Sequence, residues 1–556
     1  MSRDRSTHAA QRDVLGDLGD FTTTTRVLPI GALAVVIGVF AAYVAAALLR
    51  LINFFTNLFF YQRISIAAAS PATNHLGVFV IAVPIVGAFI VGLMARYGSD
   101  KIRGHGIPEA IEAILMKQSR VEPKVALLKP ISAAISIGSG GPFGAEGPII
   151  MTGGAFGSLI AQFVHLTAAE RKTLLVAGAA AGMSATFAAP VASVVLAVEL
   201  LLFEWKPRSI IPVALASATA AAMRRYILGV GPVFAVPAHS LSIGWEGLAG
   251  CVVAGLLGGM LSAALTYAVY ASEDAFHRLP IHWMWWPPIG GLIIGVGGLI
   301  FPQALGVGYD VIDRLLQGDV PTRLVVGVLL VKSIMWSTSL GSGTSGGVLA
   351  PLLMMGAALG AAEAHILPVE GAGFWPLVSL GAVLAGTMRA PLTGVVFALE
   401  LTHDVNMLLP LLIAVTLSHG FTVLTMKRSI LTEKISRRGY HLSQEYSVDP
   451  LEIIFAREVM RDATPDLVAD AEAGGVVAYA DEPLRLIAYR MAEKGLTRLP
   501  VIGSDGSTIG AIELADLLTA RSRVLDAEQR RERILGTRVQ LRAISALFGG
   551  DRRPTA

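Results

Sequence analysis

Glu146 is the one acidic residue in a glycine- and proline-rich stretch, 137–157, that lies between long apolar segments. An ionisable side chain at membrane depth is costly unless it faces a protein interior or a water-filled path. Gly144, Gly147 and Pro148 indicate a loop that leads into a helix N-terminus, whose N–H groups and dipole form an anion site. A carboxylate there competes with an anion and leaves when protonated or displaced. We therefore predict that Glu146 is a gate; the alternative is a structural acid that caps a helix.

Two further glycine-rich breaks, at 101–110 and 341–351, each lead into an apolar segment. Pro108 suits the first turn of a helix. Non-helical backbone at membrane depth is tolerated only where it is buried in protein or lines a cavity. We therefore expect three helix N-termini, half-helices and tilted helices inside the membrane part.

The composition indicates a polytopic membrane protein. The 556 residues are 54% hydrophobic and 15% charged, whereas soluble domains carry roughly 25% charged residues. The net charge of +3 argues against a nucleic-acid partner. Cys251 is the single cysteine, so neither a disulfide within the chain nor a cysteine metal site is possible. We expect residues 1–26 to be a cytoplasmic tail, because they lack the apolar stretch of a signal peptide.

An internal repeat divides the apolar part, 27–426, into two halves. Residues 148–157 resemble 351–360, and residues 190–200 resemble 391–401, in the same order. Repeated halves with paired broken helices are typical of transporters and channels whose site lies at the repeat interface, near mid-membrane. Chance similarity between apolar helices is the alternative, and the matched Gly, Pro and Glu positions argue against it.

The chain becomes more polar after Met426. We expect a linker at 427–450, a small α/β module at 451–525 and a charged tail at 526–556. Within the module, the pattern predicts a helix over 481–495, strands at 498–503 and 509–513, and a helix from Ala515.

The apolar part resembles the CLC family of chloride channels and chloride/proton antiporters. Gly104-His-Gly-Ile-Pro108, Gly144-Ala-Glu-Gly-Pro148 and Gly347-Val-Leu-Ala-Pro351 match three motifs of that family in order. The resemblance implies an all-α protomer of about 18 membrane helices in two inverted repeats, which pairs as a homodimer. It implies a multi-pass protein of the cell membrane with both termini in the cytoplasm. The implied activity is voltage-gated or proton-coupled chloride transport. It makes Glu146 the gating glutamate. The implied anion-binding residues are Gly104, His105, Gly106, Ile107, Pro108, Gly144, Ala145, Gly147, Val348, Leu349 and Leu431.

Several positions depart from the family pattern. His105 replaces the anion-coordinating Ser, Leu431 falls where the coordinating Tyr belongs, and Leu200 falls where antiporters have an inner, proton-transferring Glu. Ala145 replaces a basic residue and Leu349 a Phe. Backbone N–H groups survive these changes, so anion binding can persist. Proton coupling needs another carrier; our candidates are His105, Glu199 and Glu204, and a passive anion channel or a different anion are the alternatives.

His105 has two interpretations. Its ring could fill the space left by the missing hydroxyl and bond a carbonyl, or it could titrate at the inner end of the anion path. A free His has a pKa of about 6.5. In the second case, proton and anion binding would be linked at this residue.

The soluble module resembles a single CBS motif, of which two chains of a dimer could complete a pair. Nucleotide sites of that family often have Ser or Thr three residues before an Asp; here Glu513 precedes Asp516, which would repel a phosphate. A dimerisation or stabilising role is therefore favoured over nucleotide binding.

We expect no cofactor and no metal. An enzyme or sensor that uses His105 and Glu146 is disfavoured, because neither a second His at ligand spacing nor a nucleophile motif accompanies them.

Overall fold

The computed structural model describes residues 23–440, apart from 165, 241 and 319, and residues 449–522, apart from 473, 474 and 504. The described residues form two compact units, a helical unit up to 440 and a small α/β unit from 449. Most of the predicted tail at 1–26, most of the second half of the predicted linker, and the tail at 526–556 lie outside the described residues.

The helical unit begins with the long first helix that the sequence predicts, 35 residues in α2. A π-helical turn, η4 (Val198–Leu202), extends α8. The helices of the first half are α2 (Val27–Tyr61), α3 (Ala82–Tyr97), α4 (Ile107–Met116), α5 (Pro123–Gly138), α6 (Glu146–Phe163), α7 (Ala168–Phe187), α8 (Pro190–Ala197) and α9 (Pro207–Ile227).

The second half repeats this series, again with a π-helical turn, η7 (Val328–Lys332), which here joins α13 to α14. Its helices are α10 (Trp245–His277), α11 (Trp286–Ile300), α12 (Tyr309–Gln317), α13 (Thr322–Gly327), α14 (Ser333–Gly341), α15 (Leu349–Glu363), α16 (Phe374–Met388), α17 (Pro391–Thr402), α18 (Leu408–Thr425) and α19 (Ile430–Arg437).

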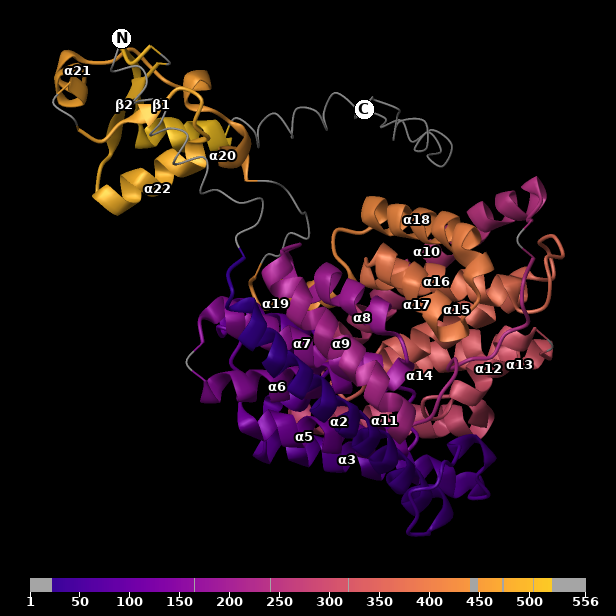
Figure 1. The fold of residues 1–556 in the computed structure, drawn as a ribbon. Helices are drawn as coiled ribbons and strands as arrows, with labels where there is room; N and C mark the ends of the chain where they lie inside the picture. Colours follow the sequence, from indigo (N-terminus) through magenta and orange to yellow (C-terminus); the bar gives the residue numbers. More distant parts are fainter. Residues whose placement is uncertain are drawn as a thin grey trace, which may run out of the picture. The chain divides into compact units, whose positions relative to one another are not determined.

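The two halves pack alike, which confirms the repeat. Helix α2 packs against α5, α7 and α9, and its counterpart α10 packs against α14, α16 and α18 (Figure 1). The pairs α3–α11 and α8–α17 join one half to the other. The N-termini of the equivalent helices α6 and α15 meet through an antiparallel bridge between Gly144 and Gly347. Equivalent helices therefore approach one point from opposite directions, which is the geometry of an inverted repeat.

The breaks between helices recur at equivalent positions. Ala188 follows the last residue of α7 and Arg389 follows the last residue of α16, and both are in the left-handed conformation, with φ of 55° and 56°. Two residues later a proline starts the next helix in each half, at Pro190 and Pro391. Proline suits the first helical turn because it needs no N–H partner there. The matched sequence segments therefore encode matched half-helices.

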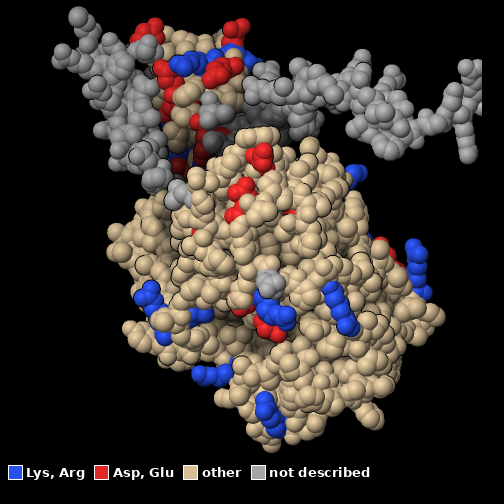
Figure 2. All heavy atoms as spheres, turned by 90° about the vertical axis from the view of Figure 1, so that its right-hand side faces the viewer, with Lys and Arg blue, Asp and Glu red and all other residues tan. Residues whose placement is uncertain are grey.

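The outer surface of the helical unit suits a lipid environment. Six of its described helical segments are long and apolar enough to cross a membrane. Figure 2 shows one face of this unit, where uncharged side chains dominate and charges are sparse. Exposed leucine, valine and phenylalanine side chains are frequent on α2, α10 and α18. The predicted multi-pass membrane fold is confirmed.

The α/β unit holds a three-stranded sheet in the order β1–β2–β3. Strand β1 (Ala478–Tyr479) is parallel to β2 (Arg498–Ile502), which is antiparallel to β3 (Thr508–Glu513). The helices are α20 (Pro450–Ile453), α21 (Pro465–Glu472) and α22 (Leu484–Lys494), and residues 514–522 are also helical. The predicted helix and two strands are present. The sequence analysis did not predict β1, which is only two residues long, or α21.

Candidate functional site

The three glycine-rich loops meet at one place and bind each other through the backbone. Gly104 N–H donates to Thr344 at 3.2 Å, and Gly346 N–H donates to Gly104 at 3.4 Å. Gly144 and Gly347 exchange two hydrogen bonds, of 3.1 and 2.8 Å. These bonds bring together the N-termini of α4, α6 and α15, as the motifs predict. Unpaired N–H groups of three helices therefore converge in the interior of the unit.

Glycine is required where the loops touch. A Cβ added at Gly106, whose φ is +94°, would overlap the carbonyl of Gly147, and a Cβ at Gly147 would overlap the carbonyl of His105. A Cβ at Gly347 would lie 2.5 Å from the carbonyl oxygen of Gly144. The motif glycines thus allow backbone to approach backbone, which no other residue permits here.

Glu146 is the first residue of α6, and its side chain is fully buried. Tyr309 O–H, at the start of α12, donates a hydrogen bond of 3.2 Å to Oε1. Oε2 has no hydrogen-bond partner among the described residues. A Cβ at Gly347 would lie only 2.8 Å from this oxygen, which places the carboxylate at the loop that opens α15. A negatively charged group thus stands where N-terminal N–H groups would attract a free anion.

Two buried lysines, Lys129 and Lys332, occupy equivalent positions in the two halves. Lys129 Nζ donates to the carbonyls of Ile102 and Gly104, at 2.8 and 2.7 Å. Lys332 Nζ donates to the carbonyls of Gly306 and Val307, at 2.9 and 3.3 Å. Each lysine therefore fixes the loop that opens a short helix, α4 in one case and α12 in the other, and adds positive charge near the converging N-termini.

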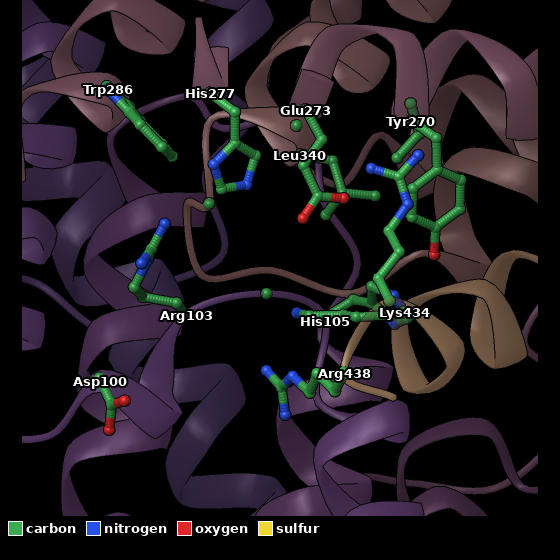
Figure 3. Close-up of a pocket in the computed structure, with 15 residues that line it drawn as sticks. Asp100, Arg103, His105, Tyr270, Glu273, His277, Trp286, Leu340, Lys434 and Arg438 are labelled. Atoms are coloured by element: carbon green, nitrogen blue, oxygen red, sulfur yellow. The ribbon is translucent and has the colours of Figure 1, made fainter. Parts of the chain in front are cut away.

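His105 lies beside a cavity of about 400 Å³ and is 4% exposed. Its Nδ1 has no partner, and the structure gives the ring no hydrogen bond within the described part of the chain. Figure 3 shows the ring reaching into the cavity from one side. The carbonyl bond that one interpretation expected for this ring is therefore not formed.

The remaining predicted anion ligands are buried in the same region. Leu431 is the second residue of α19, and its apolar side chain has no hydroxyl to offer. A hydroxyl does lie nearby, on Tyr270, but it donates to the carbonyl of Ile430 at 2.5 Å. The side chains of Ile107, Ala145, Val348 and Leu349 are fully buried. The other predicted ligands are buried as well, namely Gly104, Gly106, Pro108, Gly144 and Gly147. Any anion here would be held by backbone N–H groups rather than by hydroxyls.

Glu199 and Glu204 are engaged elsewhere. Glu199 accepts hydrogen bonds from the N–H groups of Leu392 and Thr393, at 3.0 and 2.9 Å, and so caps α17. Glu400 caps α8 in the same way. Glu204 accepts a hydrogen bond of 2.7 Å from Ser209 O–H and pairs with Lys172 at 3.1 Å. The structure therefore brings His105 to the converging N-termini, whereas Glu199 and Glu204 have structural partners of their own.

The sequence analysis missed Tyr309 and Lys332. A signal existed for both. The G-x-G of 104–106, which precedes α4, recurs as 306–308 before α12, and all four of these glycines have positive φ. Extending the repeat to this pair would have placed Tyr309 at the start of a half-helix aimed at the site, and Lys332 opposite Lys129.

The sequence profile described as "voltage gated chloride channel" matches residues 86–422. The chain belongs to this CLC family. A ClcB-like chloride channel protein of Ralstonia nicotianae is 32% identical over 343 residues, 60% of this chain and 80% of the relative. The H(+)/Cl(-) exchange transporter ClcA of Klebsiella pneumoniae is 31% identical over 409 residues, 68% of this chain and 83% of the relative.

Solved CLC structures share the fold. A slow cyanobacterial Cl-/H+ antiporter superposes with a TM-score of 0.66 at 21% identity, over 75% of this chain and 99% of that one. A CLC-type fluoride/proton antiporter superposes with a TM-score of 0.61 at 19% identity, over 72% and 97%. At these identities the likeness concerns the fold. The membrane part of this chain is therefore a CLC fold with its own set of side chains at the site.

Proposed function

We propose that this CLC protein carries chloride or a similar small monovalent anion across the membrane, and that Glu146 gates the path. The observation that carries the proposal is the place of the Glu146 carboxylate. It is fully buried at the converging helix N-termini, with one oxygen unpartnered among the described residues. The carboxylate acts there as a tethered anion, which blocks a free anion until the carboxylate is protonated or displaced.

The anion ligands of this path are backbone groups. The N–H groups at the starts of α4, α6 and α15 supply donors, from Ile107, Gly147 and Leu349 and their neighbours. His105 and Leu431 provide no hydroxyl. Because backbone dipoles attract any small anion, we expect weaker discrimination among chloride, bromide and nitrate than a site with hydroxyl ligands would give.

Proton coupling is part of the proposal, with His105 as the carrier. The relative from Klebsiella pneumoniae is named an H(+)/Cl(-) exchange transporter, which supports coupling. Leu200, in place of the inner Glu, is fully buried and has no proton to transfer. His105 has an unpartnered Nδ1 next to the cavity, so its neutral ring could accept a proton there and release it.

The assembly we propose is a homodimer with cytoplasmic termini, as the family resemblance implies. Exposed apolar side chains on α8, α17 and α18, among them Val191, Leu392 and Leu409, offer a surface that a second protomer or lipid would cover. The mass of the protein in a lipid nanodisc separates a dimer from a monomer.

For the α/β unit we propose a stabilising role without a bound nucleotide. Asp516 is 5% exposed and accepts a hydrogen bond of 2.6 Å from Arg461 Nε. Its other oxygen accepts the N–H of Glu513 at 3.0 Å. Both oxygens are therefore occupied within the unit. Calorimetry of the full chain with ATP and AMP should give no heat of binding.

Transport is tested with the full chain in liposomes under an imposed chloride gradient. Chloride flux with protons moving uphill supports the whole proposal. Chloride flux without proton movement would leave a passive anion conductor and overturn the coupling. An absence of flux for chloride, bromide and nitrate would overturn the proposal itself.

A further inference from the structure

The cavity beside His105 contains an arginine, Arg103, that has neither a hydrogen-bond partner nor an ion-pair partner among the described residues. Arg103 has a buried Nε without a hydrogen bond, and the described residues give its guanidinium neither a hydrogen bond nor an ion pair. The other three cations at this cavity are paired: Lys434 with Glu109 at 2.7 Å, Arg437 with Asp274, and Arg438 with Glu112. A buried donor without a partner is costly, so it points to something that completes it.

Arg103 is held in place although it makes no hydrogen bond. Its guanidinium carbon lies 4.5 Å from the centre of the Trp283 ring and 5.9 Å from that of Trp286, within the range of cation–π contacts. Gly343, with φ of +81°, leaves room for it, because a Cβ there would lie 2.6 Å from Nη2. The donors of Arg103 are therefore fixed before a ligand arrives, which lowers the entropy cost of binding.

The cavity is larger than chloride needs. Its volume is about 400 Å³, and its lining includes the apolar or aromatic side chains of Val269, Tyr270, Trp286 and Leu340. Figure 3 shows Arg103 on one side, His105 and Arg438 on the other, and open space between them. A flat fork of N–H donors matches the two oxygens of a carboxylate, whereas a spherical halide uses only part of it.

We infer that this cavity binds the carboxylate group of a small organic acid, with Arg103 as the main ligand and His105 Nδ1 beside it. This site is separate from the one that Glu146 occupies, and its existence does not depend on the proposed transport. One consequence does rest on the proposed function: because His105 belongs to the motif that opens α4, an acid bound here would slow anion flux through the path.

Two acids of the chain share the cavity. Glu273 lines it and forms no ion pair or hydrogen bond within the described residues, and Asp100 lines it as well. Figure 3 shows the Glu273 carboxylate directed toward the open space. Its negative charge opposes a bound carboxylate. Removing that charge should strengthen binding, and this sign distinguishes a carboxylate ligand from a cationic one.

The experiment is a calorimetric titration of the full chain in detergent micelles with sodium acetate, at pH 7.5 and fixed chloride concentration. Wild type should bind one acetate per chain. Arg103→Lys keeps the charge but loses the fork and should bind at least about tenfold more weakly. Glu273→Gln should bind about threefold or more tightly.

Arg437→Lys is the matched control, because Arg437 lines the same cavity but is already paired; it should stay within about twofold of wild type. Trp283→Leu, which removes the stacking without changing charge, should also weaken acetate binding. Because this variant keeps Arg103, weaker binding in both variants could not be explained by a folding defect of Arg103→Lys alone. Equal losses in Arg103→Lys and Arg437→Lys, no acetate binding to wild type, or weaker binding by Glu273→Gln would each overturn the proposal.

Acetate binding to Glu146→Gln tests whether this site is separate from the proposed gate. Glu146→Gln should bind acetate as wild type does, since Glu146 does not line this cavity. If acetate binding changed as much in Glu146→Gln as in Arg103→Lys, acetate would be occupying the central path and the proposed second site would be wrong. A failure of acetate binding with normal chloride flux would contradict this inference alone and leave the transport proposal standing.

Discussion

Tyr309 donates a hydrogen bond of 3.2 Å to Glu146, which links the first residue of α12 to the first residue of α6 across the two repeats. The bond leaves the second carboxylate oxygen at the start of α15. The carboxylate that we propose as the gate belongs to the first half of the chain, and the residues that hold it, Tyr309 and the loop before α15, belong to the second half. Its ease of release should depend on this phenol.

Removing the Tyr309 hydroxyl should free the gate. A hydrogen bond to a charged group is worth about 1.5–3 kcal/mol. Because about 1.4 kcal/mol is a factor of ten, we expect Tyr309→Phe to raise chloride flux at pH 7.5 by about tenfold or more. Tyr267→Phe is the control, because that phenol is exposed on α10. Flux unchanged in Tyr309→Phe would show that the hydrogen bond does not hold Glu146 in the path.

Glu199 and Glu400 should behave as caps. Each carboxylate accepts two N–H groups of the opposite half-helix, so Glu199→Gln and Glu400→Gln should each lower the free energy of unfolding by about 1–2 kcal/mol. The ratio of protons to chloride should be unchanged in both variants. Loss of proton movement in Glu199→Gln alone would restore Glu199 as a proton carrier.

His105 should link proton and anion binding if it carries the proton. A protonated ring attracts an anion, and by reciprocity a bound anion favours the proton. Chloride affinity of wild type should therefore rise as the pH falls from about 8 to 5, and His105→Ser should reduce that dependence. Calorimetry at both pH values decides. Equal slopes in the two proteins would leave His105 as packing only.

The α/β unit depends on a buried ion pair. Arg490 donates two hydrogen bonds of 2.8 Å to Glu482, which is 2% exposed. These bonds hold the pKa of Arg490 above its usual range, so the guanidinium keeps its charge, and its part of the stabilisation, until the pH is strongly basic.

Arg490→Ala should therefore destabilise the α/β unit by about 3–5 kcal/mol, because it leaves a buried carboxylate unpaired. Arg485→Ala removes a half-exposed pair with Glu452 and should cost about 0–1 kcal/mol. Hydrogen exchange of residues 498–513 in the full chain measures both. Similar protection in the two variants would contradict the assignment.

Local patterns predicted the parts of the site that lie within one segment. The glycines around Glu146, the proline at 108 and the repeat at 148–157 and 351–360 indicated helix starts, and the structure has them. The Tyr309–Glu146 contact joins residues 163 positions apart. The repeated G-x-G before Tyr309 indicates a helix start there, but it does not indicate that Glu146 is the residue Tyr309 contacts. The same holds for Arg103, whose neighbours Trp283 and Trp286 come from the other half of the chain. Contacts between the two repeats depend on how the chain folds, so they cannot be predicted from local patterns in a single sequence.

The gate itself is tested most directly by Glu146→Gln. In wild type, protonation lets the carboxylate leave the helix N-termini, so chloride flux should rise as the pH falls. The glutamine has no charge to hold it there, and its flux should be high and independent of pH. The measurement is chloride efflux from liposomes between about pH 4.5 and 7.5, for both proteins. A flat profile for Glu146→Gln is the predicted result; a profile that follows wild type would contradict the assignment of Glu146 as the gate.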